Sequence, residues 1–221
     1  MTEETKEKIV QLKKDFRANM NGVASASMRE AGIGYRLNFG IELPRIKAIV
    51  SAFEPDHELA QELWKEDVRE SKIAATMLQP VDSFCSDLAD IWVERVGTAE
   101  MAGIVSMNLF QHLPYAQEKA FQWIASDNEN QQLCGYHTLI YLLRRTTLTG
   151  RQSNELIDHA ICTLGWLANP APLRQVAWKV MLQHALQNDQ ARHNVIAAMK
   201  DAEFDETDEL KPYLEYLETE D

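Results

Sequence analysis

The sequence has few of the features that mark secreted, membrane-bound or redox-active proteins. Its three cysteines, Cys85, Cys134 and Cys162, are odd in number, form no CxxC pair and lie within apolar helical patterns. We expect three buried thiols in a reducing compartment rather than metal binding or redox activity. No run of 18 apolar residues occurs, and the charged amphipathic start lacks a signal-peptide core, so we expect a cytoplasmic protein without a membrane span.

The motifs of common catalytic machinery are missing as well. No Walker loop, GxGxxG or GxSxG is present, and the six histidines form no HExxH pattern. His137 and His184 fall within apolar helical segments, where a hydrogen-bonded core histidine is the usual finding. We therefore expect neither a metal nor a cofactor.

Negative charge is concentrated at one end of the chain. The net charge is −12, but residues 201–221 alone hold ten acidic groups and one lysine, so residues 1–200 carry 21 basic and 24 acidic groups. Basic residues in this nearly neutral body occur in clusters, which either bind phosphates or form solvated helix faces. The clustered cations that we consider for nucleic-acid binding are Arg36, Arg45, Lys47, Arg144 and Arg145.

Apolar residues recur at helical spacing throughout, as in the stripe Leu156, Ile157, Ala160 and Leu164, and no convincing alternating strand is found. Helix breaks fall at the glycines of residues 32–40, at Pro44, Pro55, Pro80 and Pro114, and at residues 169–172. About a dozen short helices, paired and antiparallel, are predicted. The fold class is all-α, with more than roughly 60% helix, well above the rate for globular proteins.

A tryptophan-centred unit is repeated four times. Each tryptophan is followed nine or ten residues later by an apolar residue and typically two small ones: Trp64 with 73–75, Trp92 with 101–103, Trp123 with 133–135 and Trp166 with 176–178. Helix pairs at such spacings bury their apolar faces by stacking. We expect one domain over residues 1–221 and buried rings for Trp64, Trp123 and Trp166; in the fourth copy Trp178 replaces the last small residue.

The acidic end is predicted to cap the stack. Leu210, Tyr213, Leu214 and Leu217 follow helical spacing, and Pro212 requires the helix to start just before it. A terminal repeat needs one polar outer face, which suits the acidic segment 201–221.

The turns before the second helices, EDVRESKIAATML and NPAPLRQVAWKVML, resemble HEAT repeats, in which an arginine reaches acceptors on the neighbouring repeat; Arg69 and Arg174 stand at that place. A more specific resemblance is carried by two segments of the first 78 residues, YRLNFGIELPRIKAIV and LAQELWKEDVRESKIAATML. They resemble the AlkD-like DNA alkylation repair family in Phe39, Gly40, Pro44, Arg45, Trp64 and Glu70. This resemblance implies a HEAT-like superhelix that holds duplex DNA in a concave basic channel. In active members it also implies hydrolysis of the glycosidic bond of an alkylated base.

The resemblance also implies catalytic residues that this chain lacks. Active members carry Trp-Asp-x-x-Asp where this chain has residues 98–102, so that Ala102 replaces an aspartate, and a tryptophan and an arginine where it has residues 130–134. Glu100 is the nearby carboxylate, a weak catalytic candidate whose helix-start position also suits the helix dipole. Three hypotheses follow: a DNA-binding relative with weak or no glycosylase activity, a HEAT-type scaffold for a protein partner, and an active glycosylase using Glu100.

Overall fold

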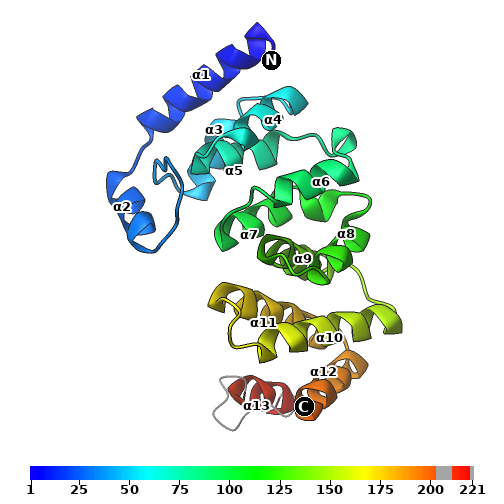
Figure 1. The fold of residues 1–221 in the computed structure, drawn as a ribbon. Helices are drawn as coiled ribbons and strands as arrows, with labels where there is room; N and C mark the ends of the chain where they lie inside the picture. Colours follow the sequence, from blue (N-terminus) through cyan, green and yellow to red (C-terminus); the bar gives the residue numbers. More distant parts are fainter. Residues whose placement is uncertain (203–210, 220–221) are drawn as a thin grey trace. The chain divides into compact units, whose positions relative to one another are not determined.

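Short helices joined by short turns make up almost all of the chain (Figure 1). The computed structural model describes residues 1–202 and 211–219, of which 72% are helical. In this part of the chain the extended pairing is limited to an isolated parallel bridge between Leu37 and Val68. None of the helices described combines the length and the hydropathy of a membrane span. The prediction of an all-α fold is confirmed.

The chain divides into two compact units, Met1–Pro114 and Tyr115–Asp221. In the first, α3, α5 and α7 pack in succession, and α4 packs against α5 as the first helix of its pair. The elements of this unit are α1 (Glu3–Ala18), α2 (Gly22–Glu30), α3 (Leu43–Val50), α4 (His57–Lys65), α5 (Arg69–Leu78), the 3-10 turn η1 (Val81–Ser83), α6 (Ser86–Val93), α7 (Ala99–Asn108) and η2 (Phe110–His112).

The second unit repeats the same plan with longer helices. Its pairs are α8 with α9 and α10 with α11, and the second helices α9 and α11 pack side by side. The elements are α8 (Ala116–Ile124), α9 (Glu129–Leu142), α10 (Gly150–Gly165), α11 (Ala171–Ala185), α12 (Asp189–Asp201) and α13 (Lys211–Thr219). Whether residues 1–221 act as a single domain stays a prediction.

Local sequence explains where the helices begin. Thr149 and Gln152 form a capping box at the start of α10, in which each side chain satisfies a backbone N–H of the other. Asn188 caps α12 by accepting from Ala191 N, and Pro170 precedes α11 with a second proline in the first turn. The breaks predicted at the prolines are therefore helix starts.

Tryptophans form the centres of the repeats as predicted for Trp64 and Trp123, each 2% exposed. The Trp64 ring on α4 stacks on that of Trp92 on α6, with centroids 4.3 Å apart and planes 7° from parallel. Phe84 meets Trp92 edge-on at 4.9 Å. In the first unit, α4 and α6 therefore contact each other through stacked aromatic rings.

Small residues let paired helices approach closely. Ala74, Ala75 and Ala102 are completely buried. A Cβ added to Gly135 on α9 would lie 2.7 Å from Ile124 Cγ2 and 2.8 Å from the Ala120 carbonyl oxygen, both on α8. The small-residue patches of the repeat are thus required by helix–helix contact.

The fourth copy departs from the prediction. Trp166 is 67% exposed, not buried, because it lies in the turn after α10 has ended, and Trp178, 6% exposed, fills the place on α11 where other copies have a small residue. The prediction of three buried thiols is also wrong. Cys134 is buried, but Cys85 precedes α6 at the surface and Cys162 lies on the outward side of α10.

The carboxyl-terminal helix α13 begins at Lys211, directly before Pro212, as the proline requires. Leu217 is 2% exposed and α13 packs against α12. Residues 203–210 and 220–221 of the predicted capping segment 201–221 lie outside the described residues, so its capping role stays a prediction.

Candidate nucleic-acid interface

The segment that carries Arg36 is fastened to the start of α5. Leu37 N donates to the Asp67 carbonyl oxygen at 3.2 Å, and Arg69 N donates to the Leu37 carbonyl oxygen at 3.1 Å. Arg36 N donates to Asp67 Oδ2 at 3.1 Å. The exposed Arg36 side chain is therefore presented from a fixed backbone.

The side chain of Glu70 holds the backbone turn at residues 39–41. Its completely buried carboxylate accepts from Phe39 N at 3.0 Å and from Ile41 N at 3.2 Å. Gly40 between them has φ +70°, and a Cβ there would lie 2.3 Å from the Asn21 carbonyl oxygen, so only glycine fits. Phe39, Gly40 and Glu70, which carry the family resemblance, serve the fold of this segment.

Arg69 connects this turn to α7. Its guanidinium, with 3% of the residue exposed, donates to the Ile41 carbonyl oxygen at 2.9 Å and to Glu100 Oε1 at 2.6 Å. Burial acts to lower the pKa of Arg69, but the hydrogen bonds and charge of Glu100 raise it overall. The predicted structural role of Arg69, reaching an acceptor on the neighbouring repeat, is confirmed.

Glu100 lies in the first turn of α7 with both carboxylate oxygens within hydrogen-bond distance of Arg69. Beside it, the Tyr35 hydroxyl and Thr98 Oγ1 are 3.0 Å apart, and Thr98 caps α7 by accepting from Met101 N. Burial is the main reason why the pKa of Tyr35 rises to about 12. Tyr35 is therefore a neutral phenol and Glu100 a paired carboxylate. Ala102, completely buried, offers only a methyl group.

Two basic residues of α5 are buried in the fold. Arg69 is buried in its ion pair, and Lys72 donates to the Arg95 carbonyl oxygen while its ammonium lies 5.2 Å from the Trp64 ring centroid. Burial lowers the pKa of Lys72. Neither residue can contribute to a surface that meets phosphates.

Three other cations of the first unit face solvent. Arg36, Arg45 and Lys47 are all exposed, and Arg45 Nε donates to Asn19 Oδ1 at 2.7 Å. Arg45 and Lys47 stand two residues apart on α3, so they point to different sides of that helix. The structure places Arg45 toward the α1–α2 connection and Lys47 over a groove.

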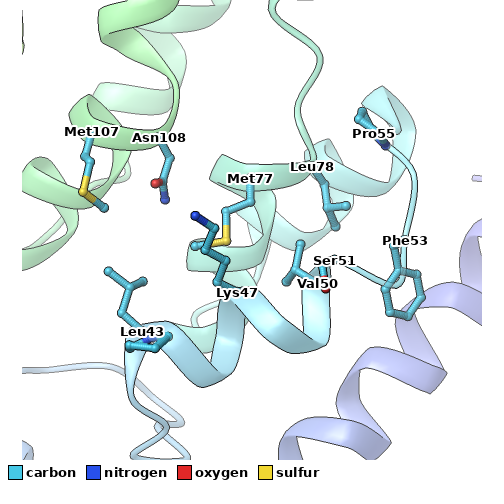
Figure 2. Close-up of a pocket in the computed structure, with 11 residues that line it drawn as sticks. Leu43, Lys47, Val50, Ser51, Phe53, Pro55, Met77, Leu78, Met107 and Asn108 are labelled. Atoms are coloured by element: carbon cyan, nitrogen blue, oxygen red, sulfur yellow. The ribbon is translucent and has the colours of Figure 1, made fainter.

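That groove has a volume of about 550 Å³ and lies among α3, α5 and α7. Figure 2 shows the Lys47 side chain reaching from α3 toward Met77 and Asn108. Asn108 is held by a 2.8 Å hydrogen bond to Thr76 Oγ1. The other lining residues are mostly apolar: Leu43, Pro44, Val50, Ser51, Phe53, Pro55, Leu78 and Met107. Sequence reasoning missed this groove, because its methionines come from separate helices.

The second unit presents Arg144 and Arg145 where α9 ends, and both are exposed. The Arg144 guanidinium lies 5.0 Å from the Tyr141 ring centroid, a cation–π contact. The Gln187 amide donates to the carbonyl oxygens of Leu143 at 2.8 Å and Thr146 at 2.6 Å, on either side of the two arginines. The backbone that carries them is thereby fixed.

His184 supports Gln187 from the core. Its Nε2 lies 2.7 Å from Ser153 Oγ and its Nδ1 lies 3.1 Å from Gln187 Oε1, while the residue is 3% exposed. Burial lowers the pKa of His184. His184 is thus the hydrogen-bonded core histidine that was predicted. Within residues 1–202 and 211–219 no three His, Cys, Asp or Glu side chains converge as metal ligands would.

A family model described as DNA alkylation repair enzyme matches residues 12–193. No curated protein matches the chain. A solved structure with TM-score 0.75 and 16% sequence identity covers 86% of this chain and 80% of its own. It is described as a new family of proteins related to the HEAT-like repeat DNA glycosylases with affinity for branched DNA structures. This likeness shows a HEAT-like repeat fold, and the family model spans most of the sequence. The chain therefore belongs to the DNA alkylation repair enzyme family.

Proposed function

We propose that this protein binds DNA through exposed arginines and lysines and releases alkylated bases slowly or not at all. Family membership supports this function, as does the fold shared with a protein that has affinity for branched DNA. The observation that carries the proposal is the exposure of Arg36, Arg45, Lys47, Arg144 and Arg145 on fixed backbone segments. When cations that face solvent neutralise phosphates, the counterions condensed on the DNA are released, and this release drives binding.

Slow chemistry follows from the first turn of α7. A glycosylase needs a carboxylate that stabilises the positive charge developing on the sugar. Glu100 offers one, but its oxygens already pair with Arg69, and the buried methyl of Ala102 cannot replace a carboxylate. Losing such a group commonly costs two to three powers of ten in rate, about 3–4 kcal/mol.

Two other functions keep specific support. A glycosylase that uses Glu100 is favoured by the partial exposure of that side chain, 28%. A scaffold for a protein partner is favoured by the apolar groove below Lys47. Direct measurements separate the three functions.

The binding test measures affinity for linear duplex DNA over a range of salt concentrations. We expect binding without sequence preference, with an affinity that falls steeply as salt rises. Replacing Arg45, Lys47, Arg144 and Arg145 by glutamine should flatten the slope of log affinity against log salt by about 0.9 for each lost phosphate contact. The matched control replaces four other exposed cations, Lys14, Arg17, Arg95 and Arg151, and should leave the slope nearly unchanged. If the native chain shows no association at low salt, the scaffold function becomes the better explanation.

The catalytic test incubates the protein with duplex carrying N7-methylguanine or N3-methyladenine and measures liberated base against buffer. We expect little or no enzyme-dependent release. Rapid release that disappears in Glu100→Gln would contradict this and identify Glu100 as the catalytic carboxylate. Arg69→Gln then serves as the companion variant, since it frees the same carboxylate from its partner.

A further inference from the structure

Trp166 is the exception among the five tryptophans. Trp64, Trp92, Trp123 and Trp178 are at most 6% exposed, whereas Trp166 is 67% exposed and the next residue, Leu167, is 75% exposed. Both lie in the connection between α10 and α11. A large apolar pair at the tip of a connection costs solubility, so its exposure calls for a physical explanation.

The exposure is imposed by the turn itself. Asn169 N donates to the Trp166 carbonyl oxygen at 2.9 Å, closing a turn, and the Asn169 side chain donates to the Thr163 carbonyl oxygen at 2.9 Å. Arg174 Nε donates to the Leu164 carbonyl oxygen at 3.3 Å. The prolines at 170 and 172 fix their own φ angles at the start of α11. The turn is thus anchored to both helices while its two large side chains point away from the core.

The stretch of sequence that contains this turn has no acidic residue. Acidic residues make up 34 of the 221 residues, yet none occurs between His159 and Asn188, a stretch that includes Arg174 and the exposed Lys179. The first turn of α11 also has no acidic residue, and its amino-terminal end carries the positive side of the helix dipole. In a chain of net charge −12, such a stretch suits the approach of a polyanion.

We propose that Trp166 and Leu167 form a wedge that stacks on an open base-pair end, as found where DNA strands branch. This inference rests on the DNA binding proposed above and names the DNA feature that is recognised. In a continuous duplex each base pair is covered by its neighbours, so an indole gains nothing unless it unstacks them. At a branch point the terminal faces are uncovered, and aromatic stacking on a base is favourable without any sequence preference.

The binding test compares a three-way junction with a linear duplex of the same number of base pairs. Trp166→Ala should weaken junction binding on the order of tenfold, the scale of one lost base–aromatic stack. Linear-duplex affinity should change less than twofold, and the salt slope should not change because the indole is uncharged. Trp166→Phe should restore most of the junction affinity. Leu186→Ala, at an apolar site of the same unit that is 46% exposed, should have no effect.

A fluorescence measurement tests the contact directly, because the other four tryptophans are shielded from solvent. Acrylamide should quench Trp166 in the free protein, and the junction should protect it while linear duplex should not. If junction preference survives Trp166→Ala, or if acrylamide still reaches Trp166 in the junction complex, the wedge is wrong although DNA binding stands. If the native protein binds neither DNA, the proposed function itself fails and the wedge falls with it.

Discussion

Individual residues that carry the family resemblance act in the fold of the first unit before they act in any reaction. Glu70 holds the turn at Phe39 and Ile41, Gly40 occupies a conformation closed to other residues, and Arg69 ties that turn to Glu100. A match to such residues predicts the shape of the segment. It does not predict chemistry, because the Glu70 carboxylate and the Arg69 guanidinium are already engaged in hydrogen bonds within the fold.

Removing the Glu70 carboxylate should destabilise the first unit strongly. Glu70→Ala leaves two buried backbone N–H groups without their acceptor and removes a 3.2 Å ion pair with Arg69. We expect a loss of about 3–5 kcal/mol in the free energy of unfolding, measured by urea denaturation. Glu3→Ala, which breaks only an exposed pair with Lys6, is the control and should cost less than about 1 kcal/mol. Equal effects would show that the buried carboxylate is dispensable.

His137 should make stability depend on pH. Burial, and then the charge of Lys179, lowers its pKa from 6.5 to about 4. Since the unfolded chain binds the proton first, stability is complete above about pH 6.5 and is lost as the pH falls toward 4. The ring keeps some contact with solvent, so we expect His137 to contribute about 1–2 kcal/mol to this loss. Denaturation at pH 7 and pH 4.5 should show a smaller difference for His137→Leu than for the exposed control His193→Leu. An unchanged difference would rule out His137 as the cause.

Helices as elements are positioned by small residues at their contacts. Gly135 lets α9 approach α8 so closely that a Cβ at this position would collide with α8. In the first unit, buried alanines stand at the corresponding places on α5 and α7. In the fourth copy Trp178 stands at such a place, and Trp166, in the turn after α10, faces solvent. The fourth copy thus takes its buried tryptophan from the second helix of the pair.

Gly135→Ala tests this requirement. The new methyl would collide with Ile124 and with the Ala120 carbonyl oxygen, so we expect a loss of about 1–3 kcal/mol in the free energy of unfolding. Gly150→Ala is the matched control, because nothing lies within 4 Å of its added Cβ and alanine is the better helix former. It should be neutral or slightly stabilising. Thermal denaturation followed by circular dichroism distinguishes the two, and a harmless Gly135→Ala would contradict the packing requirement.

The whole molecule combines an exposed set of cations with an acidic end, and these should oppose each other in DNA binding. Residues 203–210, outside the described residues, hold five acidic groups: Glu203, Asp205, Glu206, Asp208 and Glu209. Converting all five to their amides should strengthen DNA binding at low salt by reducing repulsion from the phosphates. The gain should shrink as salt is raised, because exposed charges are screened. An affinity that stays constant across salt would show that the acidic segment does not act electrostatically on DNA.

The sequence by itself determined the helical fold, because apolar spacing, proline breaks and caps act locally and were read correctly for most elements. It also indicated the repeat, since tryptophans and small residues recur at intervals typical of stacked helix pairs, although Trp166 of the fourth copy lies outside the core. The tertiary structure alone decided which residues remain available. Arg69 and Lys72 count as basic residues in the sequence but are buried, Glu100 is paired, and Trp166 faces solvent while Trp178 does not. These outcomes depend on contacts between residues that are distant in the sequence, and a local pattern holds no information about such contacts.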